Sequence, residues 1–475
     1  MDSFLLHREK LDCDEIYSKM ILPILDQFTD VKQHEVCIYS GASLQMQSEG
    51  STSRKNINKI ENHVSVGLGL RICDKSKRLV ACSCMDLRRS TIEKLIKNTV
   101  GMMRNIRPDP SFISYSPEIR FSKIASNIVF DQAIHDITED QVIDSVHAMR
   151  MKVREIDDSR LVQSVLPGFS AHSNTIFIAN SNGLKVIEDH TSAASDCTVL
   201  IKHDDEMDSD IDYVIGRKLR DVAGKHLEIV ATNAFNKARM LIGKQEVKSG
   251  TYPVIFTERA TATMLLKSLA EAMNAESIQQ KNSYLKSNDV DLTIAPDHVT
   301  LIDDGRSTRF SSIGTSSFDA EGYPTRTKKL VDRGQLSMFL HNTYTASKMH
   351  TDPTGNASRI GLDQIGIGVT NMYFDPPSDY TIKDDALLNE FENGIMIDDS
   401  GDSVNLLTGD FQGMATKAFF IENGEIKYPI NQCVFAFNMN DVIKRIVIFG
   451  KNMIDFGGLI ARKTWIDKMQ IASNE

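Results

Sequence analysis

The sequence lacks a long apolar run. Its longest apolar stretches, VIFTERATATMLL and ILPILDQF, are interrupted by polar or charged residues before they reach the roughly 18 residues that cross a bilayer. The first residues, MDSFLLHREKLDCDE, contain acidic side chains and no apolar core of signal-peptide length. We therefore expect no export, no membrane contact and a cytoplasmic location.

Cysteine is sparse and positive charge is not in excess. The seven cysteines are an odd number and are scattered, which is unlike the dense framework of a small secreted domain and fits reduced thiols in a cytoplasm. Cys82 and Cys84 share a strand face, but no CxxC spacing or paired His supports a metal clip there. The formal net charge of −10 is the wrong sign for a chain that neutralises phosphates, so we expect no nucleic-acid partner.

Several catalytic and cofactor motifs are also missing. The sequence has no GxSxG and no GxxxxGK[ST], and GTSSFD at 314–319 lacks the second glycine of a nucleophile elbow. GLG at 67–69 and GIG at 366–368 lack the third glycine of a dinucleotide fingerprint. No HExxH occurs, so His341 and His350 are interpreted as ordinary packing or surface residues. The residues alone therefore define no catalytic constellation.

The sequence does contain enough apolar residues for a large core, since they make up 41% of the 475 residues. Residues 1–247 are predicted to form an α+β domain, in which an antiparallel sheet is covered by helices near 13–28, from Ser90 onward, and at 139–156. The acidic segment HDDEMDSD at 203–210 lacks the Gly and Glu of a calcium loop and is predicted to be a solvated loop. A long helix is expected from about 222 to 245.

Residues 248–475 are predicted to form a mainly antiparallel β domain opened by one helix, which gives an α+β fold overall. Turn signals punctuate this half, including the tight turns at 332–334 and at Asn423-Gly424. The opening helix, 257–276, follows the strand TYPVIF and has apolar residues at i, i+3, i+4, i+7 and i+11. Thr257 is positioned to cap its first free N–H groups, and Glu258 favours the positive end of the helix dipole.

An ordered series of segments in the second half carries a family resemblance. These are GTYPVIFTERATATMLLKSLAEAMNAESIQQKNSYL, SSFDAEGYPTRTKKLVDRGQLSMFLHNTYTASKM, TGNASR, TNMYF, TGDFQGMATKAFFIENGEIKYPI and GKNMID. Together they resemble the TldD/PmbA family, and most closely its PmbA (TldE) branch. The resemblance spans about 240–475 and is weaker before that.

The resemblance implies a heterodimeric zinc metallopeptidase whose TldD-type subunit holds the metal through a His-Glu-x-x-x-His helix motif and a later cysteine. Aligned without gaps, the three helix positions fall here on Leu266, Lys267 and Glu271. Leucine has no lone pair for zinc, an ammonium repels the cation, and one carboxylate cannot hold it alone. We therefore expect no metal and no catalytic residue in this chain, with zinc carried by the partner subunit.

The preferred hypothesis is a non-catalytic subunit that pairs with a homologous TldD-type zinc-bearing chain and helps to enclose unfolded or leader peptides. Strand addition to exposed sheet edges would hold such peptides by their backbone. Eight residues of the family-like segments are candidates for lining this cavity or shaping its loops, although turn chemistry is the favoured explanation for each: Asp319, Glu321, Gly322, Thr354, Gly355, Asn356, Thr370 and Asn371.

The alternative hypothesis is a homodimeric binding or regulatory protein without peptidase activity, consistent with the family's older description as a modulator of DNA gyrase. The acidic charge then favours protein partners over DNA.

Overall fold

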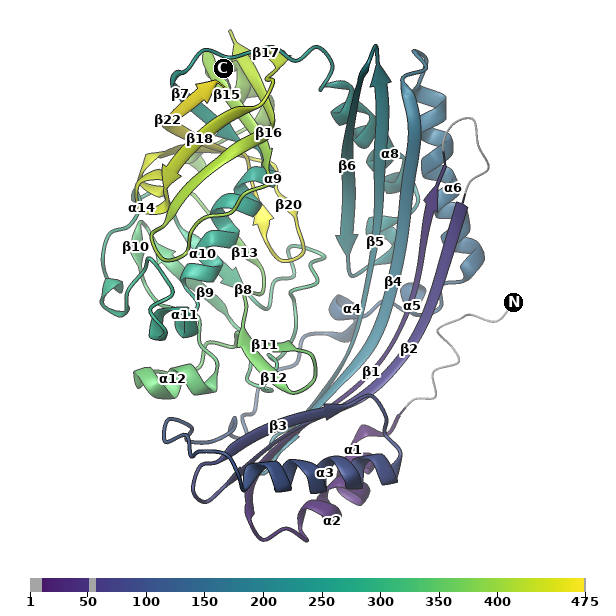
Figure 1. The fold of residues 1–475 in the computed structure, drawn as a ribbon, viewed down its shortest axis with the longest axis vertical. Helices are drawn as coiled ribbons and strands as arrows, with labels where there is room; N and C mark the ends of the chain where they lie inside the picture. Colours follow the sequence, from purple (N-terminus) through teal and green to yellow (C-terminus); the bar gives the residue numbers. More distant parts are fainter. Residues whose placement is uncertain (1–10, 51–56, 474–475) are drawn as a thin grey trace.

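The N-terminal half is built on one antiparallel sheet of long strands in the order β3-β2-β1-β4-β5-β6. The computed structural model describes residues 11–50 and 57–473. Four strands of the sheet run for 18 or 19 residues, and the sheet curves strongly along their length (Figure 1). Its strands are β1 Val31–Glu49, β2 Ile57–Asp74, β3 Leu79–Cys84, β4 Val162–Asn180, β5 Lys185–His203 and β6 Glu206–Gly216.

Helices cover one face of this sheet at both ends. The cluster at the β3 end contains Val36 and Ile38 of β1, whereas the cluster at the other end contains Leu44 and Met46 of the same strand. Since alternate residues of a strand point to opposite faces, these even-numbered side chains share one face. Its covering segments are α1 Cys13–Glu15, η2 Ile16–Ile21, α2 Leu22–Leu25 and α3 Arg89–Met103 at the first end, and α6 Glu139–Ile156 and α8 Lys225–Arg239 at the second.

The C-terminal half packs against the opposite face of the sheet. Cys37 of β1 and Ile178 of β4, which point to that face, form a small buried cluster with Phe318. Three short helices lie in the connections of the N-terminal half. They are α4 Ser126–Val129 and α5 Gln132–His135, between α3 and α6, and α7 Leu219–Val222, between β6 and α8. The molecule therefore has three layers, in the order helices, curved sheet and β-rich half (Figure 1).

The β-rich half contains a ring of strands closed by the pairing of β7 with β22. The ring runs β7-β15-β16-β18-β22, and only the β7–β15 pair in it is parallel. Its strands, with those attached to it, are β7 Gly250–Phe256, β14 Thr381–Ile382, β15 Asn393–Ser400, β16 Asp410–Glu422, β17 Glu425–Pro429, β18 Cys433–Asn438, β19 Ile446–Gly450 and β22 Thr464–Ser473.

Smaller sheets and short helices complete this half. The strands are β8 Leu301–Asp304, β9 Thr327–Asp332, β10 Gln335–Leu336, β11 Ala357–Ile360, β12 Gln364–Ile367, β13 Met372–Phe374, β20 Ile454–Asp455 and β21 Ile460–Ala461. The helices are α9 Glu258–Ala260, η3 Thr261–Leu266, α10 Lys267–Ala272, α11 Ala275–Gln279, η4 Ser287–Asp289, α12 Thr343–Met349, η5 Ser378–Tyr380, α13 Asp384–Glu390, α14 Met439–Val442 and η6 Ile443–Arg445. The sequence predicted only the opening helix in this half, so α12, α13 and the shorter helical segments were not predicted.

The predicted fold class is confirmed: the chain is α+β, with a helix-covered sheet followed by a mainly β half. Several local predictions differ. The helix expected over 222–245 is shorter, α8 at Lys225–Arg239, and the separate short helix α7 precedes it. The helix expected over 257–276 stops at Ala272. In the described part of the chain, no helix has the length and apolar character needed to cross a membrane.

The prediction of a solvated loop at 203–210 is wrong. Only a tight turn at Asp204 and Asp205 separates β5 from β6, and the rest of the segment is strand. Asp210 is buried and lies 2.7 Å from Lys417 Nζ and 3.3 Å from an Arg259 guanidinium nitrogen. Its negative charge is therefore compensated by two cations from the other half of the chain.

Candidate functional site

A cavity of about 440 Å³ lies between the sheet and the C-terminal half. Tyr39, Ile176 and His190 line it from strands β1, β4 and β5, and Phe318 lines it from the opposite side. Four of the eight predicted cavity residues also line it: Asp319, Gly355, Asn356 and Thr370. The volume and the mixture of apolar walls with a few polar groups are typical of ligand pockets.

Asn356 and Thr370 are held at the cavity by the buried carboxylate of Asp303. Asp303 accepts hydrogen bonds from Thr370 N at 2.7 Å, from Thr370 Oγ1 at 2.8 Å and from Asn356 Nδ2 at 2.8 Å. It is fully buried and is paired with Lys328 Nζ at 3.0 Å. The polar groups of these two residues are thus already engaged, so they shape the wall of the cavity.

Thr354 and Asn371 lie behind that wall and do not line the cavity. Thr354 Oγ1 accepts a hydrogen bond from His341 N at 2.8 Å and is 2.8 Å from Asn356 Oδ1. Asn371 Nδ2 donates to Asp304 O at 2.6 Å, whereas its Oδ1 is buried and has no hydrogen-bond partner. Both residues have structural contacts of the kind expected of loop anchors.

Asp319 organises a tight turn. Its carboxylate accepts hydrogen bonds from the N–H groups of Glu321, Tyr323 and Ala357, at 2.9, 3.0 and 3.0 Å. Burial, together with the negative charge of Glu321, raises the pKa of Asp319. Gly322, within this turn, has a φ of +73°, which an L side chain rarely adopts. These residues therefore behave as turn residues, the second of the two interpretations offered by the sequence.

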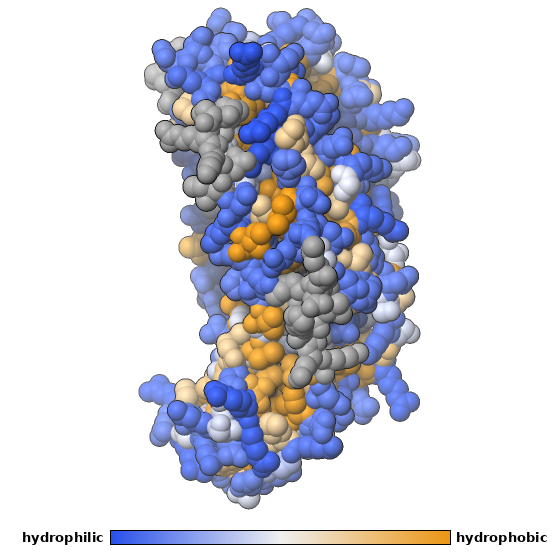
Figure 2. Space-filling model, turned by 90° about the vertical axis from the view of Figure 1, so that its right-hand side faces the viewer, coloured by the Kyte–Doolittle hydropathy of each residue, from blue (hydrophilic) through white to orange (hydrophobic). Residues whose placement is uncertain are grey.

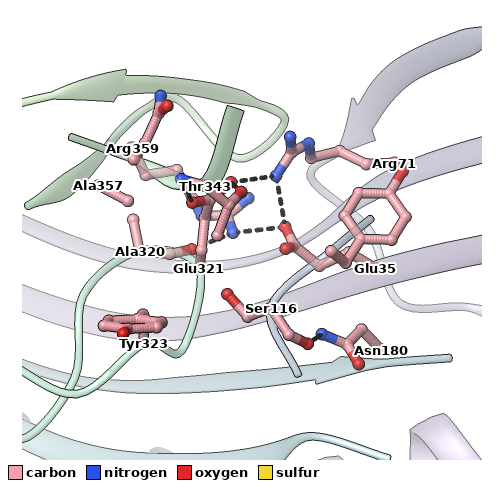
Figure 3. A network of polar contacts seen from close by, with 12 residues as sticks. Glu35, Arg71, Ser116, Asn180, Ala320, Glu321, Tyr323, Thr343, Ala357 and Arg359 are labelled. Atoms are coloured by element: carbon pink, nitrogen blue, oxygen red, sulfur yellow. Dashed lines mark hydrogen bonds and ion pairs between the residues drawn. The ribbon is translucent and has the colours of Figure 1, made fainter. Parts of the chain in front are cut away.

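Glu321 belongs to an ion network that joins the two halves (Figure 3). Arg71 Nη1 lies 3.3 Å from Glu321 and 3.1 Å from Glu35, and Arg359 Nη2 lies 3.1 Å from Glu35. Thr343 donates its N–H and its hydroxyl to Glu321, both at 2.8 Å. Burial opposes the charge of Arg71, but the two carboxylates outweigh it and raise the Arg71 pKa. The network fixes the sheet against the C-terminal half.

A second polar cluster beside the cavity was not predicted from the sequence. Glu188 and His190 lie two residues apart on β5, with 2.7 Å between Glu188 Oε2 and His190 Nε2. Ser316 and Ser317 also donate their hydroxyls to Glu188. Burial opposes ionisation of Glu188, but the hydrogen bond and charge of His190 and the hydrogen bonds from Ser317 outweigh it and lower the Glu188 pKa to about 2. Both hydroxyls donate to the carboxylate and not to the imidazole, so His190 does not activate either serine as a nucleophile.

Arg217 connects this cluster to the C-terminal half. It is buried and donates hydrogen bonds to the carbonyl oxygens of Thr191, Ile313 and Thr315. Burial lowers its pKa to about 10. These bonds fasten the end of β6 to the loop that forms one side of the cavity.

The opening helix presents its predicted apolar stripe to the core. Thr257 Oγ1 accepts the N–H of Ala260 and so caps the helix as predicted. Leu266, at one of the zinc-ligand positions of the resemblance, is 0% exposed and belongs to the largest apolar cluster of the chain. Lys267 and Glu271 are exposed. Residues five apart in an α-helix point about 140° away from each other, which places Leu266 and Glu271 on different sides of the helix.

These residues do not fit a metal ion. A buried leucine and an exposed lysine offer no ligand, and the remaining carboxylate points away from the leucine side. Within residues 11–50 and 57–473, no group of three or more His, Cys, Asp or Glu side chains is arranged to hold a metal. No step of a reaction is therefore assigned to a metal in this chain.

Fold and site together define a two-part α+β protein in which buried ion networks join the halves around a small cavity. Family models match both parts: the PmbA/TldA metallopeptidase central domain matches residues 133–242, and the C-terminal domain of the same family matches residues 249–473. The chain belongs to the PmbA/TldD metallopeptidase family.

Individual relatives agree with this assignment. The metalloprotease PmbA homolog of Buchnera aphidicola (subsp. Acyrthosiphon pisum) is 26% identical over 391 residues, which cover 80% of this chain and 82% of the relative. Metalloprotease PmbA of Escherichia coli is 23% identical over 423 residues, 89% of each chain. The crystal structure of TldE from Thermococcus kodakarensis superposes with a TM-score of 0.83 at 20% identity, over 96% of this chain and all of the other, which shows a shared fold.

Proposed function

We propose that this chain is the non-catalytic subunit of a zinc metallopeptidase, paired in the cytoplasm with a homologous TldD-type chain that carries the metal. The observation that carries the proposal is the burial of Leu266 in the core at a position where the catalytic branch has a zinc-binding histidine. Hydrolysis therefore requires another polypeptide, because a metal-activated water needs ligands that this helix does not provide.

The substrates we propose are unfolded or leader peptides. An extended peptide is recognised largely through its backbone, which accommodates many sequences. The cavity offers apolar contacts from Ile176, Ile178 and Phe318 to a side chain of such a peptide. The polar residues predicted from the sequence support the walls of this cavity through their internal hydrogen bonds.

Co-expression with the homologous zinc-bearing chain tests the pairing. The two chains are expected to elute together, and the pair is expected to cleave an unfolded peptide in a chelator-sensitive manner. Separate elution of the two chains, or a pair without peptidase activity, would contradict the proposal. A homodimer that does not bind the homologous chain would favour the alternative binding or regulatory protein.

Filling the cavity tests its role separately. Ile176→Trp is expected to reduce peptide cleavage by the assembled pair without preventing assembly, because Ile176 lines the cavity. Ile187→Trp is the matched control, since Ile187 is 40% exposed on the opposite face of the sheet. Equal cleavage by the two variants would show that the peptide does not enter this cavity.

A further inference from the structure

Strand β2 has an edge that no other strand covers. It pairs with β1 along its whole length, but β3 pairs only with residues 68–73 of its other side. Residues 58–66 therefore present their outer N–H and C=O groups unpaired by any strand of the described chain. A free edge of this length is a template for pairing with another chain, which natural proteins usually prevent.

Apolar side chains continue past the covered part of the sheet onto this edge. Ile60 pairs with Met46 and Val64 pairs with Ala42, and both β1 residues belong to the buried core. Paired residues of adjacent strands point to the same face of a sheet. Ile60 and Val64 therefore continue, on β2, the apolar side chains that the helix-covered face of β1 carries. They are nevertheless 37% and 57% exposed, because α6 packs on β1 and β4.

Figure 2 views the molecule from the side on which β2 and α6 lie, and it shows apolar surface among hydrophilic residues there. Two further apolar residues, Ile143 and Met151, are 37% and 46% exposed on α6 itself. Both features, the free backbone and the uncovered apolar row, occur on the same segment.

We infer that residues 58–66 pair antiparallel with the same residues of a second copy of this chain, about a twofold axis at Asn62. A twofold axis perpendicular to the sheet keeps each face on its own side. The possible registers therefore pair even-numbered residues with even-numbered ones and odd-numbered residues with odd-numbered ones. The register centred on Asn62 places Ile60 opposite Val64 and Glu61 opposite His63, each twice. Apolar pairs and carboxylate–imidazole pairs directly opposite each other stabilise a sheet.

The two neighbouring symmetric registers are poorer. Centring on Glu61 places two carboxylates directly opposite each other, and like charges in that position destabilise a sheet. Centring on His63 keeps an apolar pair, Ile60 opposite Val66, but it places Val64 opposite Asn62, places the two His63 side chains opposite each other and separates Glu61 from His63. Among these three registers, only the one centred on Asn62 combines apolar pairs with carboxylate–imidazole pairs.

This inference concerns two copies of one chain and does not depend on the metal-bearing partner. It is tested with the purified chain alone, in which Asn62→Cys is treated with a short thiol-to-thiol cross-linker. Directly opposed residues have Cβ atoms about 5 Å apart, so the thiols that Asn62→Cys introduces into the two copies are expected to cross-link to each other. Lys59→Cys is the matched control, because six residues of strand, about 20 Å, would separate the two introduced thiols.

The parent chain, with its native cysteines, gives the background. Val64→Lys in the Asn62→Cys chain is expected to reduce the cross-linked dimer at least tenfold, because it places an ammonium in the apolar pair. Cross-linking of Asn62→Cys no greater than that of Lys59→Cys would overturn the inference, as would a monomer in light scattering at tens of micromolar. If the thiol introduced by Asn62→Cys were shielded from thiol reagents in a monomer, another part of the chain would cover the edge, and that result would also overturn the inference.

Discussion

The ion network between the halves predicts a large stability effect for Arg71→Met. Arg71 compensates two carboxylates, Glu35 and Glu321, each about 1% exposed. Methionine fills similar space but leaves these charges less compensated. Removing one partner of a buried ion pair typically costs about 3–5 kcal/mol.

The remaining contacts place the expected loss near the lower limit of that range. Glu35 keeps Arg359 at 3.1 Å, and Glu321 keeps two hydrogen bonds from Thr343. We therefore expect Arg71→Met to lower the free energy of unfolding by about 3 kcal/mol. The measurement is urea denaturation followed by circular dichroism at neutral pH.

A surface ion pair supplies the matched control. Arg88 lies 2.6 Å from Asp86, but its side chain is 81% exposed, so Arg88→Met is expected to cost less than about 1 kcal/mol. Adding Glu321→Gln to Arg71→Met is expected to restore part of the lost stability, because it removes an uncompensated buried charge. The reasoning is refuted if the two arginine variants lose equal stability, or if Glu321→Gln makes the Arg71 variant less stable still.

Three further predictions concern single residues. Leu266→Ala is expected to lower the free energy of unfolding by about 2–5 kcal/mol in urea denaturation, because Leu266 is fully buried. Burial lowers the pKa of His341 to about 4, so the unfolded chain binds a proton there between pH 6.5 and 4 that the folded chain does not. The contribution of His341 to the free energy of unfolding is present above pH 6.5, and about 3 kcal/mol of it is lost as the pH falls to 4. The variant His341→Asn is expected to make the free energy of unfolding less dependent on pH in this range. Gly355→Ala is expected to lower the thermal unfolding midpoint by several degrees, because φ is +74° and the added Cβ would lie 2.6 Å from a main-chain carbonyl oxygen.

Each of these three variants has a matched control at a residue of the same region of the chain. Lys267→Ala changes an exposed residue on the same helix and is expected to alter stability by less than about 0.5 kcal/mol. His350→Asn changes an exposed histidine with φ of +53°, a conformation that asparagine tolerates. Gly361→Ala has a similar φ of +72° but only a 3.8 Å contact. If any control matched its partner variant, burial or close packing at that site would not be the cause of the effect.

Two local patterns in the sequence predicted the local structure correctly. The tight turn at Asn423-Gly424 joins β16 to β17, and both residues have positive φ, at 52° and 77°, as a two-residue hairpin of this sequence requires. The apolar stripe of the opening helix is buried throughout. The π-helical segment η3 was not predicted, because the apolar spacing fits an ordinary α-helix equally well.

Features that depend on distant contacts could not be predicted. The sequence around Asp210 predicts an acidic loop, because its ion-pair partner Arg259 lies 49 residues later in the chain. Glu188 meets Ser317 across 129 residues, so the cluster beside the cavity has no local sequence signal. The candidate cavity residues were found only through the family resemblance, and their internal hydrogen bonds show that most of them support its walls.

The most direct test of the account measures zinc and peptidase activity in the purified chain, alone and with its homologous partner. The chain alone is expected to contain far less than one zinc per molecule and to leave an unfolded peptide intact, whereas the pair contains zinc and cleaves it. Stoichiometric zinc in the chain alone, together with cleavage that a chelator abolishes, would contradict the account.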